Sequence, residues 1–388
     1  MRRLRTRRML FAVVAAGTFA GVIAGVTAGP PELAAGAATH PGDLSASAPV
    51  TVVASGLNEP RSLVWGPHHH LLVSEAGTPD GVCDPTGLSC YGVTGTIADV
   101  TSGTPVRIVT GLVSKLDEQE VVGPDGLVYV NGNLYTLETG SPEDVPSFLP
   151  AGLKATLTTQ AGALINVTGG RLSVVADPGI VDYQWTQAHL NLAADYPDAN
   201  PYAVIAKPGG GFYLVDAAAN TLDSIDRHGN VHVLAFIPTT VAGTDAVPTC
   251  LAMGPDGAVY LGQITGHNNT NTAANVYRYS PRSGSLTVWQ SGFSAINGCG
   301  FGTDGDFYVT ELDQTGFAPV TEPDGLVIQI SHNGKRTVLG AGKLIGPSGF
   351  LAGPDGSIYV VNNSVIWPPY LGPGNTGPFN AGQVVKIG

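Results

Sequence analysis

The sequence is poor in charged residues, and basic residues are the scarcer kind. Charged side chains make up 12% of its 388 residues, with 18 Lys and Arg against 30 Asp and Glu. Because five arginines and one acidic residue precede residue 39, residues 39–388 keep 13 basic and 29 acidic side chains, a formal net charge of −16. A charge of this sign argues against nucleic acid and anionic membrane surfaces as partners.

The signatures of several common active sites are also missing. The chain contains no Gly-x-Ser-x-Gly elbow, which argues against a serine hydrolase of the α/β type. The glycine-rich stretch 208–211 is not followed by a helix, which argues against a phosphate loop. His68, His69 and His70 lie between two predicted strands, so we expect an exposed turn there rather than a metal site.

Residues 1–38 predict an export signal. Five arginines within residues 1–8 precede an apolar stretch and two small-residue sites, at 26–28 and 35–37, a pattern typical of a cleaved secretory signal. Residues 6–10 resemble a twin-arginine signal; general secretion and an uncleaved anchor are the alternatives. No cysteine directly follows either site. We therefore expect a secreted, extracytoplasmic protein with no stable membrane anchor after cleavage and a flexible linker at 39–49.

A unit of two strands recurs six times along the remaining chain. The second strands lie at 71–75, 134–138, 212–216, 259–263, 307–311 and 358–362. The first strands open on Pro60, Pro124, Pro201, Pro248, Ile296 and Pro347. Third and fourth strands follow, for example at 275–279 and 285–289. Four antiparallel strands in each of six units predict an all-β, six-bladed β-propeller over residues 50–388.

Two details set the predicted register of the ring. The last copy ends one strand short at 383–387, and a spare strand at 50–54 precedes the first copy, so that pairing them closes the ring. In the second copy, 123–126 resembles the Gly-Pro-Asp-Gly turn of other copies. We instead place Pro124 at the start of the strand and the turn at 131–133.

Long insertions are expected on one face of the propeller. The first strand of each blade crosses the ring and the second returns, so the connections after second strands and before first strands share a face. The insertions are 77–95, 139–162, 180–200, 266–273, 313–324 and 365–382. Their bias to one side predicts a binding face, the alternative being drift of surface loops. A helix is expected at 183–194, with Trp185 and His189 packing on the ring.

Polar side chains are predicted to surround the channel mouth on that face. The residue after each strand opener is polar, which yields the candidate binding residues Arg61, Asp125, Tyr202, Thr249, Asn297 and Ser348. Acids at 117, 118 and 120 are expected to overhang this mouth. Asp125, Asn297 and Glu118 would offer oxygens to Ca²⁺ or another divalent cation. The alternative is that Arg61 neutralises Asp125.

The second strands end on a further set of polar residues. We expect these to accept hydrogen bonds from local backbone. They are Glu75, Glu138, Asp216, Gln263, Glu311 and Asn362.

The four cysteines have two different contexts. Cys83 and Cys90 bracket a short segment without strand pattern and predict a disulfide in an oxidising compartment. Cys250 and Cys299 lie on the first strands of neighbouring blades and are expected on opposite strand faces. A bridge between them and two buried free thiols are both compatible with the sequence. Their spacing does not suit a structural zinc site.

Several short segments carry a family resemblance. They are 56–61, 74–77, 90–95, 182–183, 200–202, 273–278 and 382–385. In these segments the chain resembles the ScyD/ScyE family of exported bacterial β-propellers. The resemblance implies the fold and export and defines no activity.

A more distant similarity is to NHL-repeat proteins and to lactonases of the regucalcin type. It implies a divalent cation held by carboxylate and amide side chains at Pro-Asp-Gly and Pro-Asn-Gly strand starts. Residues 124–126 match the first pattern, Asn297 lacks the preceding proline, and Glu59 lies near a third ligand position with different spacing.

Two functional hypotheses follow. The first is a binding or scaffold protein that contacts an unknown small molecule or protein with its looped face, and a structural role at the cell surface is related to it. The second is a cation-dependent lactonase or hydrolase with Asp125 as ligand or general base and Asn297 as co-ligand.

Overall fold

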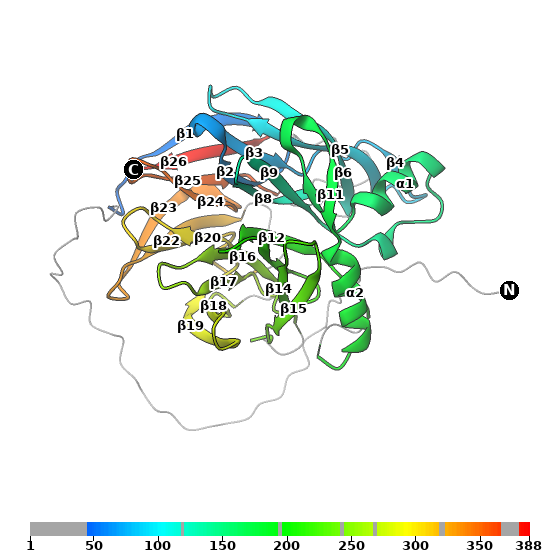
Figure 1. Ribbon diagram of the computed structural model, residues 1–388. Coiled ribbons are helices and arrows are strands. Elements are labelled where there is room, and N and C mark those ends of the chain that lie inside the picture. The colour runs from blue at the N-terminus through cyan, green and yellow to red at the C-terminus, as the bar shows by residue number, and fades with distance from the viewer. Residues whose placement is uncertain are drawn as a thin grey trace, which may run out of the picture. The chain divides into compact units, whose positions relative to one another are not determined.

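The computed structural model describes residues 45–117, 120–192, 196–240, 244–266, 270–317, 323–365 and 380–388. Their strands form six antiparallel sheets, the blades of a six-bladed β-propeller (Figure 1). The predicted fold class is therefore confirmed. The predicted signal at 1–38 and most of the linker lie outside the described residues. Over the described part of the chain, no helix is both long and apolar enough to cross a membrane.

The blades follow one another along the chain, each with its first strand innermost. Blade 1 contains β2 (Pro60–Trp65), β3 (Leu71–Glu75), β5 (Ser89–Asp99) and β6 (Val106–Asp117), with β4 (Val82–Cys83) and β7 (Glu120–Val122) beside them. Blade 2 contains β8 (Pro124–Val130), β9 (Asn133–Glu138), β10 (Leu164–Asn166) and β11 (Ser173–Ala176). Blade 3 contains β12 (Pro201–Ala206), β13 (Phe212–Asp216), β14 (Thr221–Ile225) and β15 (Val231–Phe236).

The remaining blades complete the ring. Blade 4 contains β16 (Pro248–Met253), β17 (Val259–Gln263), β18 (Ala274–Ser280) and β19 (Ser285–Phe293). Blade 5 contains β20 (Ile296–Phe301), β21 (Phe307–Glu311), β22 (Asp324–Ile330) and β23 (Arg336–Ile345). Blade 6 contains β24 (Phe350–Ala352), β25 (Ile358–Asn362), β26 (Gly382–Ile387) and β1 (Val50–Leu57).

The two ends of the propeller chain close the ring as predicted. The N-terminal strand β1 pairs with the C-terminal strand β26, with Val50 opposite Ile387 and Ser55 opposite Gln383. Figure 1 shows these two strands side by side, one blue and one red. The pairing satisfies strand edges that would otherwise be open to other chains.

Blade 2 has the predicted register. Pro124 opens β8, and Val130 pairs with Asn133 across a two-residue turn. Both turn residues have positive φ, 51° at Asn131 and 79° at Gly132. This is the Asn-Gly turn that matches the twist of a β-hairpin, so the Gly-Pro-Asp-Gly sequence before it is the strand start and not a turn.

The hydrophobic core is divided among the interfaces between neighbouring blades. Val215 and Leu222 of blade 3 pack with Leu251 and Leu261 of blade 4, and each of the other five interfaces has a cluster of the same kind. Alternate residues of each strand point to opposite faces. Each sheet therefore buries one face against the preceding blade and the other against the next.

The 77–95 insertion differs from its prediction. Cys83 lies in β4 and Cys90 in β5, and the two residues pair directly in the sheet. The Cys83–Cys90 disulfide is confirmed, but the segment around it is a small extension of blade 1 and not a loop without strands. Helix α1 (Ala151–Gln160) was not predicted; its Leu157 packs on Tyr91 of this extension.

Cys250 and Cys299 are bridged. The sequence left this pairing open because the two residues were expected on opposite strand faces. That arrangement in fact suits a bridge, since one face of blade 4 packs on the opposite face of blade 5. Gly262 leaves room for the sulfur, because a Cβ atom there would lie 2.8 Å from Cys250 Sγ.

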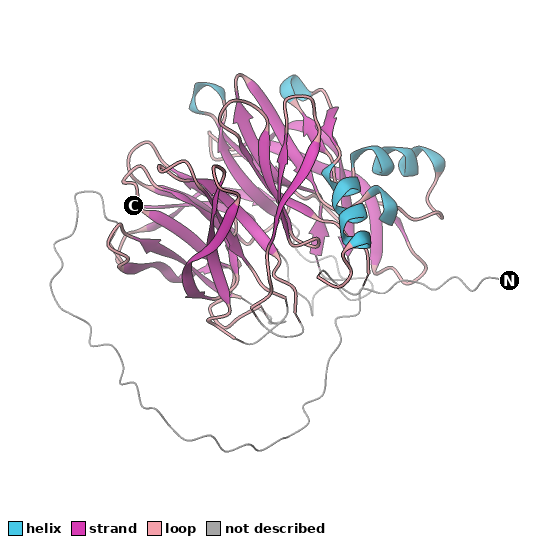
Figure 2. Ribbon diagram, turned by 60° about the horizontal axis from the view of Figure 1, so that its bottom comes forward, coloured by secondary structure: helices cyan, strands magenta, loops and turns pink. Residues whose placement is uncertain are grey.

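Two predicted element boundaries are wrong. The inner strand of blade 6 begins at Phe350 and not at Pro347, although Ser348 still donates its backbone N–H to the Val361 carbonyl at 3.1 Å. Helix α2 spans Pro178–Ala188 and so begins and ends earlier than the predicted 183–194. Trp185 stacks on Phe236 of β15 with ring centroids 5.9 Å apart, which places α2 against blade 3. Figure 2 shows the longer helices at the right of the sheets and short helical turns at other points of the rim.

Three fully buried carboxyl groups meet where α2 covers blade 3. The carboxyl groups of Asp182 of α2, Asp216 and Asp223 of β14 interact electrostatically. Asp216 accepts backbone N–H groups from residues 200, 218 and 219, which favours its ionised form. Burial and the two neighbouring acids raise the pKa of Asp182 well above its usual range. Asp182 is thus the member of this carboxyl pair that keeps its proton.

We predict that Asp182→Asn makes the protein more resistant to alkaline pH. The raised pKa of Asp182 means that its stabilising proton is retained at low pH and lost as pH rises. An asparagine amide can still donate to Asp216 and has no proton to lose. Urea unfolding from pH 5 to 9 should show the variant gaining stability over wild type as pH rises, by about 1–3 kcal/mol, the range for a hydrogen bond to a charged group.

The control is Asp226→Asn, in an exposed turn of the same blade. It should leave the pH dependence between 5 and 9 unchanged. If the free energies of unfolding of Asp182→Asn and wild type changed with pH in parallel, the assignment of the proton to Asp182 would be wrong.

Candidate functional site

The structure brings five of the six predicted binding residues to one cavity. Arg61, Asp125, Tyr202, Thr249 and Asn297 line a space of about 130 Å³ between the inner strands. The sixth residue, Ser348, supports the wall, since its hydroxyl donates to the Arg61 carbonyl at 2.9 Å.

A β-bulge sets the direction of these side chains. In five inner strands the pairing shifts within the first four residues, as between Pro124 and Leu127 of β8 and between Pro248 and Cys250 of β16. A bulge bends the strand and redirects the side chain beside it. The residue after each strand opener therefore points into the channel.

A second ring of residues lies two positions further along each inner strand. These residues are mostly apolar, and all of them line the same cavity. They are Leu63, Leu127, Val204, Leu251, Cys299 and Phe350. The same six residues belong to or pack against the hydrophobic clusters between neighbouring blades. The polar ring therefore lies at the inner edge of the hydrophobic core.

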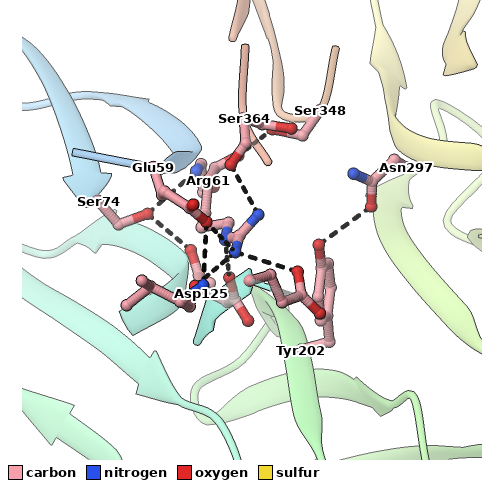
Figure 3. Close-up of polar contacts among 12 residues, drawn as sticks. Glu59, Arg61, Ser74, Asp125, Tyr202, Asn297, Ser348 and Ser364 are labelled. Carbon is pink, nitrogen blue, oxygen red and sulfur yellow. Dashed lines mark hydrogen bonds and ion pairs between the residues drawn. The ribbon is translucent and has the colours of Figure 1, made fainter. Parts of the chain in front are cut away.

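Arg61 is the most connected residue of the polar ring (Figure 3). Its side chain is 3% exposed and lies 3.1 Å from Glu59, 3.3 Å from Glu120 and 3.3 Å from Asp125. It also donates to the carbonyl of Val121 at 2.6 Å and to that of Ser364 at 2.8 Å. Burial alone would lower the pKa of Arg61, but the three carboxylates raise it, so the guanidinium stays charged.

Asp125 is held in the cavity wall by charge and not by hydrogen bonds. Its Oδ1 atom lies 3.3 Å from Arg61 Nε, and neither atom has a hydrogen-bond partner among the described residues. Burial raises the pKa of Asp125 to about 7; Arg61 opposes this rise and Glu120 adds to it. Asp125 is therefore a buried carboxyl group that changes charge near neutral pH.

The opposite side of the ring is neutral and polar. The Tyr202 hydroxyl donates to Asn297 Oδ1 at 3.0 Å, and Thr249 Oγ1 donates to the Ile296 carbonyl at 2.5 Å. Burial raises the pKa of Tyr202, so its phenol stays protonated. Since both hydroxyl protons are used, Tyr202 and Thr249 present acceptor oxygens.

Four of the residues that end the second strands hold local backbone as expected. Asp216 and Glu311, for example, accept from the N–H groups of Asn200 and Ser294 at 2.8 Å, and Glu75 and Asn362 make equivalent bonds. Glu138 and Gln263 differ, because their buried side-chain atoms have no partner among the described residues. Burial, followed by the nearby Asp125, raises the pKa of Glu138 well above its usual range.

The predicted divalent-cation site stays a prediction, with Asp125 and Asn297 both on the cavity wall. No group of three or more His, Cys, Asp and Glu side chains within them is arranged to hold a metal ion. The guanidinium of Arg61 faces Asp125, which would repel a cation coordinated on that side. Glu118, the third predicted ligand, lies outside the described residues. Glu120 lies in β7 and binds Arg61.

Glu59 is the member of this site whose role the sequence did not reveal. It was considered only as a metal ligand, yet it is fully buried and paired with Arg61. Its φ of 47° is unusual for a residue with a side chain. The pairing of Glu59 with Arg61 therefore depends on a left-handed backbone conformation that a glutamate in a sequence does not predict.

Comparison with known proteins supports the fold alone. No protein-family model matches the sequence, and no curated protein matches it significantly, so the ScyD/ScyE resemblance stays a prediction. Among solved structures, the chain is similar to a gluconolactonase from Xanthomonas campestris at 10% identity, covering 90% of this chain and 94% of the other with a TM-score of 0.52. It is also similar to a glucose dehydrogenase at 12% identity, covering 88% and 99% with a TM-score of 0.53.

We predict that Arg61→Met strongly destabilises the protein. The change removes the guanidinium that both Glu59 and Asp125 contact in the buried site, and breaking a buried ion pair typically costs about 3–5 kcal/mol of free energy of unfolding. The loss should be larger at pH 8 than at pH 5, where the carboxylates can take up protons. Urea denaturation followed by tryptophan fluorescence measures both.

Arg278→Met is the matched control, because Arg278 makes an ion pair with Asp256 at the surface. Exposed pairs contribute little. If both variants lost the same free energy of unfolding, the conclusion that the buried Arg61 contacts stabilise the protein more than a surface ion pair would be wrong.

Proposed function

We propose that this protein is an exported β-propeller that binds a small polar molecule in the cavity at the mouth of its channel. The observation that carries the proposal is that five blades each place one polar side chain on the wall of a single cavity. These residues are Arg61, Asp125, Tyr202, Thr249 and Asn297. A concave site with a few converging polar groups is the usual form of a small-molecule site.

The position of the insertions supports the same site. Pro60 pairs with Glu75 and Pro124 with Glu138, so the start of each inner strand lies beside the end of the second strand. The connections that leave the second strands therefore begin next to the polar ring. Helix α1 and the β4 extension belong to these connections. Loops on a rigid scaffold commonly carry binding functions.

The cysteines support export. The structure contains two disulfides, Cys83–Cys90 and Cys250–Cys299. Disulfides of this kind persist in oxidising compartments and are rare in the cytosol. Together with the signal predicted at residues 1–38, they favour a mature protein that works outside the cytoplasm.

We predict that a library of small polar compounds, screened by ligand-observed NMR, yields ligands that depend on the cavity. Thr249→Trp should abolish their binding by filling the polar mouth of the cavity. Asn297→Leu should weaken binding about three- to tenfold by removing a polar group of the mouth. Asn333→Leu, in an exposed turn, should change nothing. Ligands that bind all three variants equally would place the binding site elsewhere.

The second candidate is a lactonase or hydrolase with Asp125 as general base, because burial raises the pKa of Asp125 to about 7. In this reaction Asp125 would take a proton from water as the water oxygen bonds to the lactone carbonyl carbon. The ring C–O bond would then break, and its oxygen would receive the proton from Asp125. The product would be a hydroxy acid.

We predict for this candidate that Asp125→Asn lowers kcat/KM at least about a hundredfold, the lower range for loss of a general base. The wild-type rate should rise with pH through about 7, because the base must be ionised. Hydrolysis of a lactone panel followed by pH-stat measures both. Equal rates for wild type and variant would exclude Asp125 as the base and leave the binding proposal intact.

A further inference from the structure

The two disulfides of the propeller differ in their exposure to solvent. Cys250 and Cys299 are 4% and 7% exposed and belong to the hydrophobic cluster between blades 4 and 5. Cys83 is exposed at the surface, whereas its partner Cys90 is buried. A thiolate opens a disulfide by attacking one of its sulfur atoms, so the rate depends on access to that atom. Cys83 therefore offers the most accessible disulfide sulfur of the folded protein.

The exposed bridge holds a strand that has few other contacts with its sheet. Strand β4 contains two residues, and its two ladder pairs with β5 join Val82 to Tyr91 and Cys83 to Cys90. The turn between the two strands, residues 84–89, is exposed or half-buried throughout. Short exposed segments of this kind open at a small cost in free energy. The covalent bond is therefore the strongest link between β4 and β5.

The parts of the chain on either side of this extension are anchored independently of the bridge. The Thr78 N–H donates to Thr94 Oγ1 at 2.8 Å, and the same hydroxyl donates to the Thr78 carbonyl at 2.8 Å. Helix α1 is fixed on β6 by Gln160, whose side chain accepts from the Val113 N–H at 3.0 Å. Opening the bridge should therefore loosen residues 79–89 and leave α1 and the blades in place.

We propose that the Cys83–Cys90 bridge is a thiol-exchange site whose opening releases β4 from β5 while the propeller stays folded. The thiolate of a small thiol bonds to Cys83 Sγ, the bond between the two cysteines breaks, and Cys90 leaves as a thiolate that takes up a proton. A second thiolate then attacks the sulfur of the small thiol, so that Cys83 is released as a thiol and the reagent is oxidised to its disulfide. This inference does not rest on the proposed binding function.

The first test compares how fast the two bridges open in the folded wild-type protein. The protein is treated with dithiothreitol at about pH 8, where thiols are partly ionised, and samples are quenched with N-ethylmaleimide and mapped by peptide mass spectrometry. We expect Cys83 and Cys90 to be labelled at least about tenfold faster than Cys250 and Cys299, which react only when the contacts between blades 4 and 5 open. Equal rates, the reverse order or no labelling of Cys83 and Cys90 would overturn the proposal.

The second test identifies the sulfur atom that is attacked. Glutathione has a single thiol, so its mixed disulfide with the protein can be trapped with N-ethylmaleimide before the second step. Fragmentation of the labelled peptide should place glutathione on Cys83 and the maleimide on Cys90. Glutathione on Cys90 would show that the exposed sulfur is not the point of attack.

The third test measures what the opened bridge releases. Amide hydrogen exchange of residues 79–89 should become at least about tenfold faster after selective reduction of the wild-type protein, and equally so in Cys83→Ser combined with Cys90→Ser. Exchange in α1 and in β13 should not change. Cys250→Ser combined with Cys299→Ser is the matched control and should leave residues 79–89 as they are.

The reduced wild-type protein decides the matter even where a variant fails to fold. Unchanged exchange of residues 79–89 after the bridge has opened would show that it does not hold β4. Faster exchange throughout the blades would show that the bridge stabilises the whole propeller, and either result would overturn the proposed local release.

Discussion

The buried guanidinium of Arg61 is the interaction on which the channel mouth depends. It joins three blades: its own blade 1, Asp125 of blade 2 and the carbonyl of Ser364 after the second strand of blade 6. Those blades also include the seam where β1 and β26 close the ring. A charge buried this deeply costs several kcal/mol unless it is paired. Its carboxylate partners must therefore stay in place, and the mouth keeps one shape.

The site is a consequence of the way a propeller is built. Inner strands run from one face of the ring to the other, and a bulge near the start of each one turns a single side chain into the channel. Two positions further along, the inner strands contribute to the hydrophobic clusters between blades. A polar ring at the inner edge of the core follows from this arrangement, and only the identity of its residues makes the cavity specific. The Cys250–Cys299 bridge ties two of these strands together at the cavity wall.

The parts of the fold that sequence could predict are those governed by local rules. Second strands, the Asn131–Gly132 turn and the closing pair β1–β26 follow from alternation and turn chemistry, and all were found where expected. The placement of the polar ring followed from the same repeat. Sequence reasoning failed where the structure depends on contacts between blades. The Cys250–Cys299 bridge forms because the sheets of two neighbouring blades face each other, and the Glu59–Arg61 pair requires a left-handed backbone conformation at a glutamate. The hydrophobic pattern of helix α1 is weak because most of its residues are exposed or half-buried. The sequence therefore did not predict this helix.

The same geometry argues for binding ahead of turnover. Asp125 has the buried position and near-neutral pKa of a general base. Ester or lactone hydrolysis also requires donors aimed at the oxygen that becomes negative in the transition state. Around this cavity the hydroxyl protons of Tyr202 and Thr249 are directed to other acceptors, and Arg61 is matched by three carboxylates. Negative charge that develops at this position is therefore poorly stabilised, which favours binding over hydrolysis.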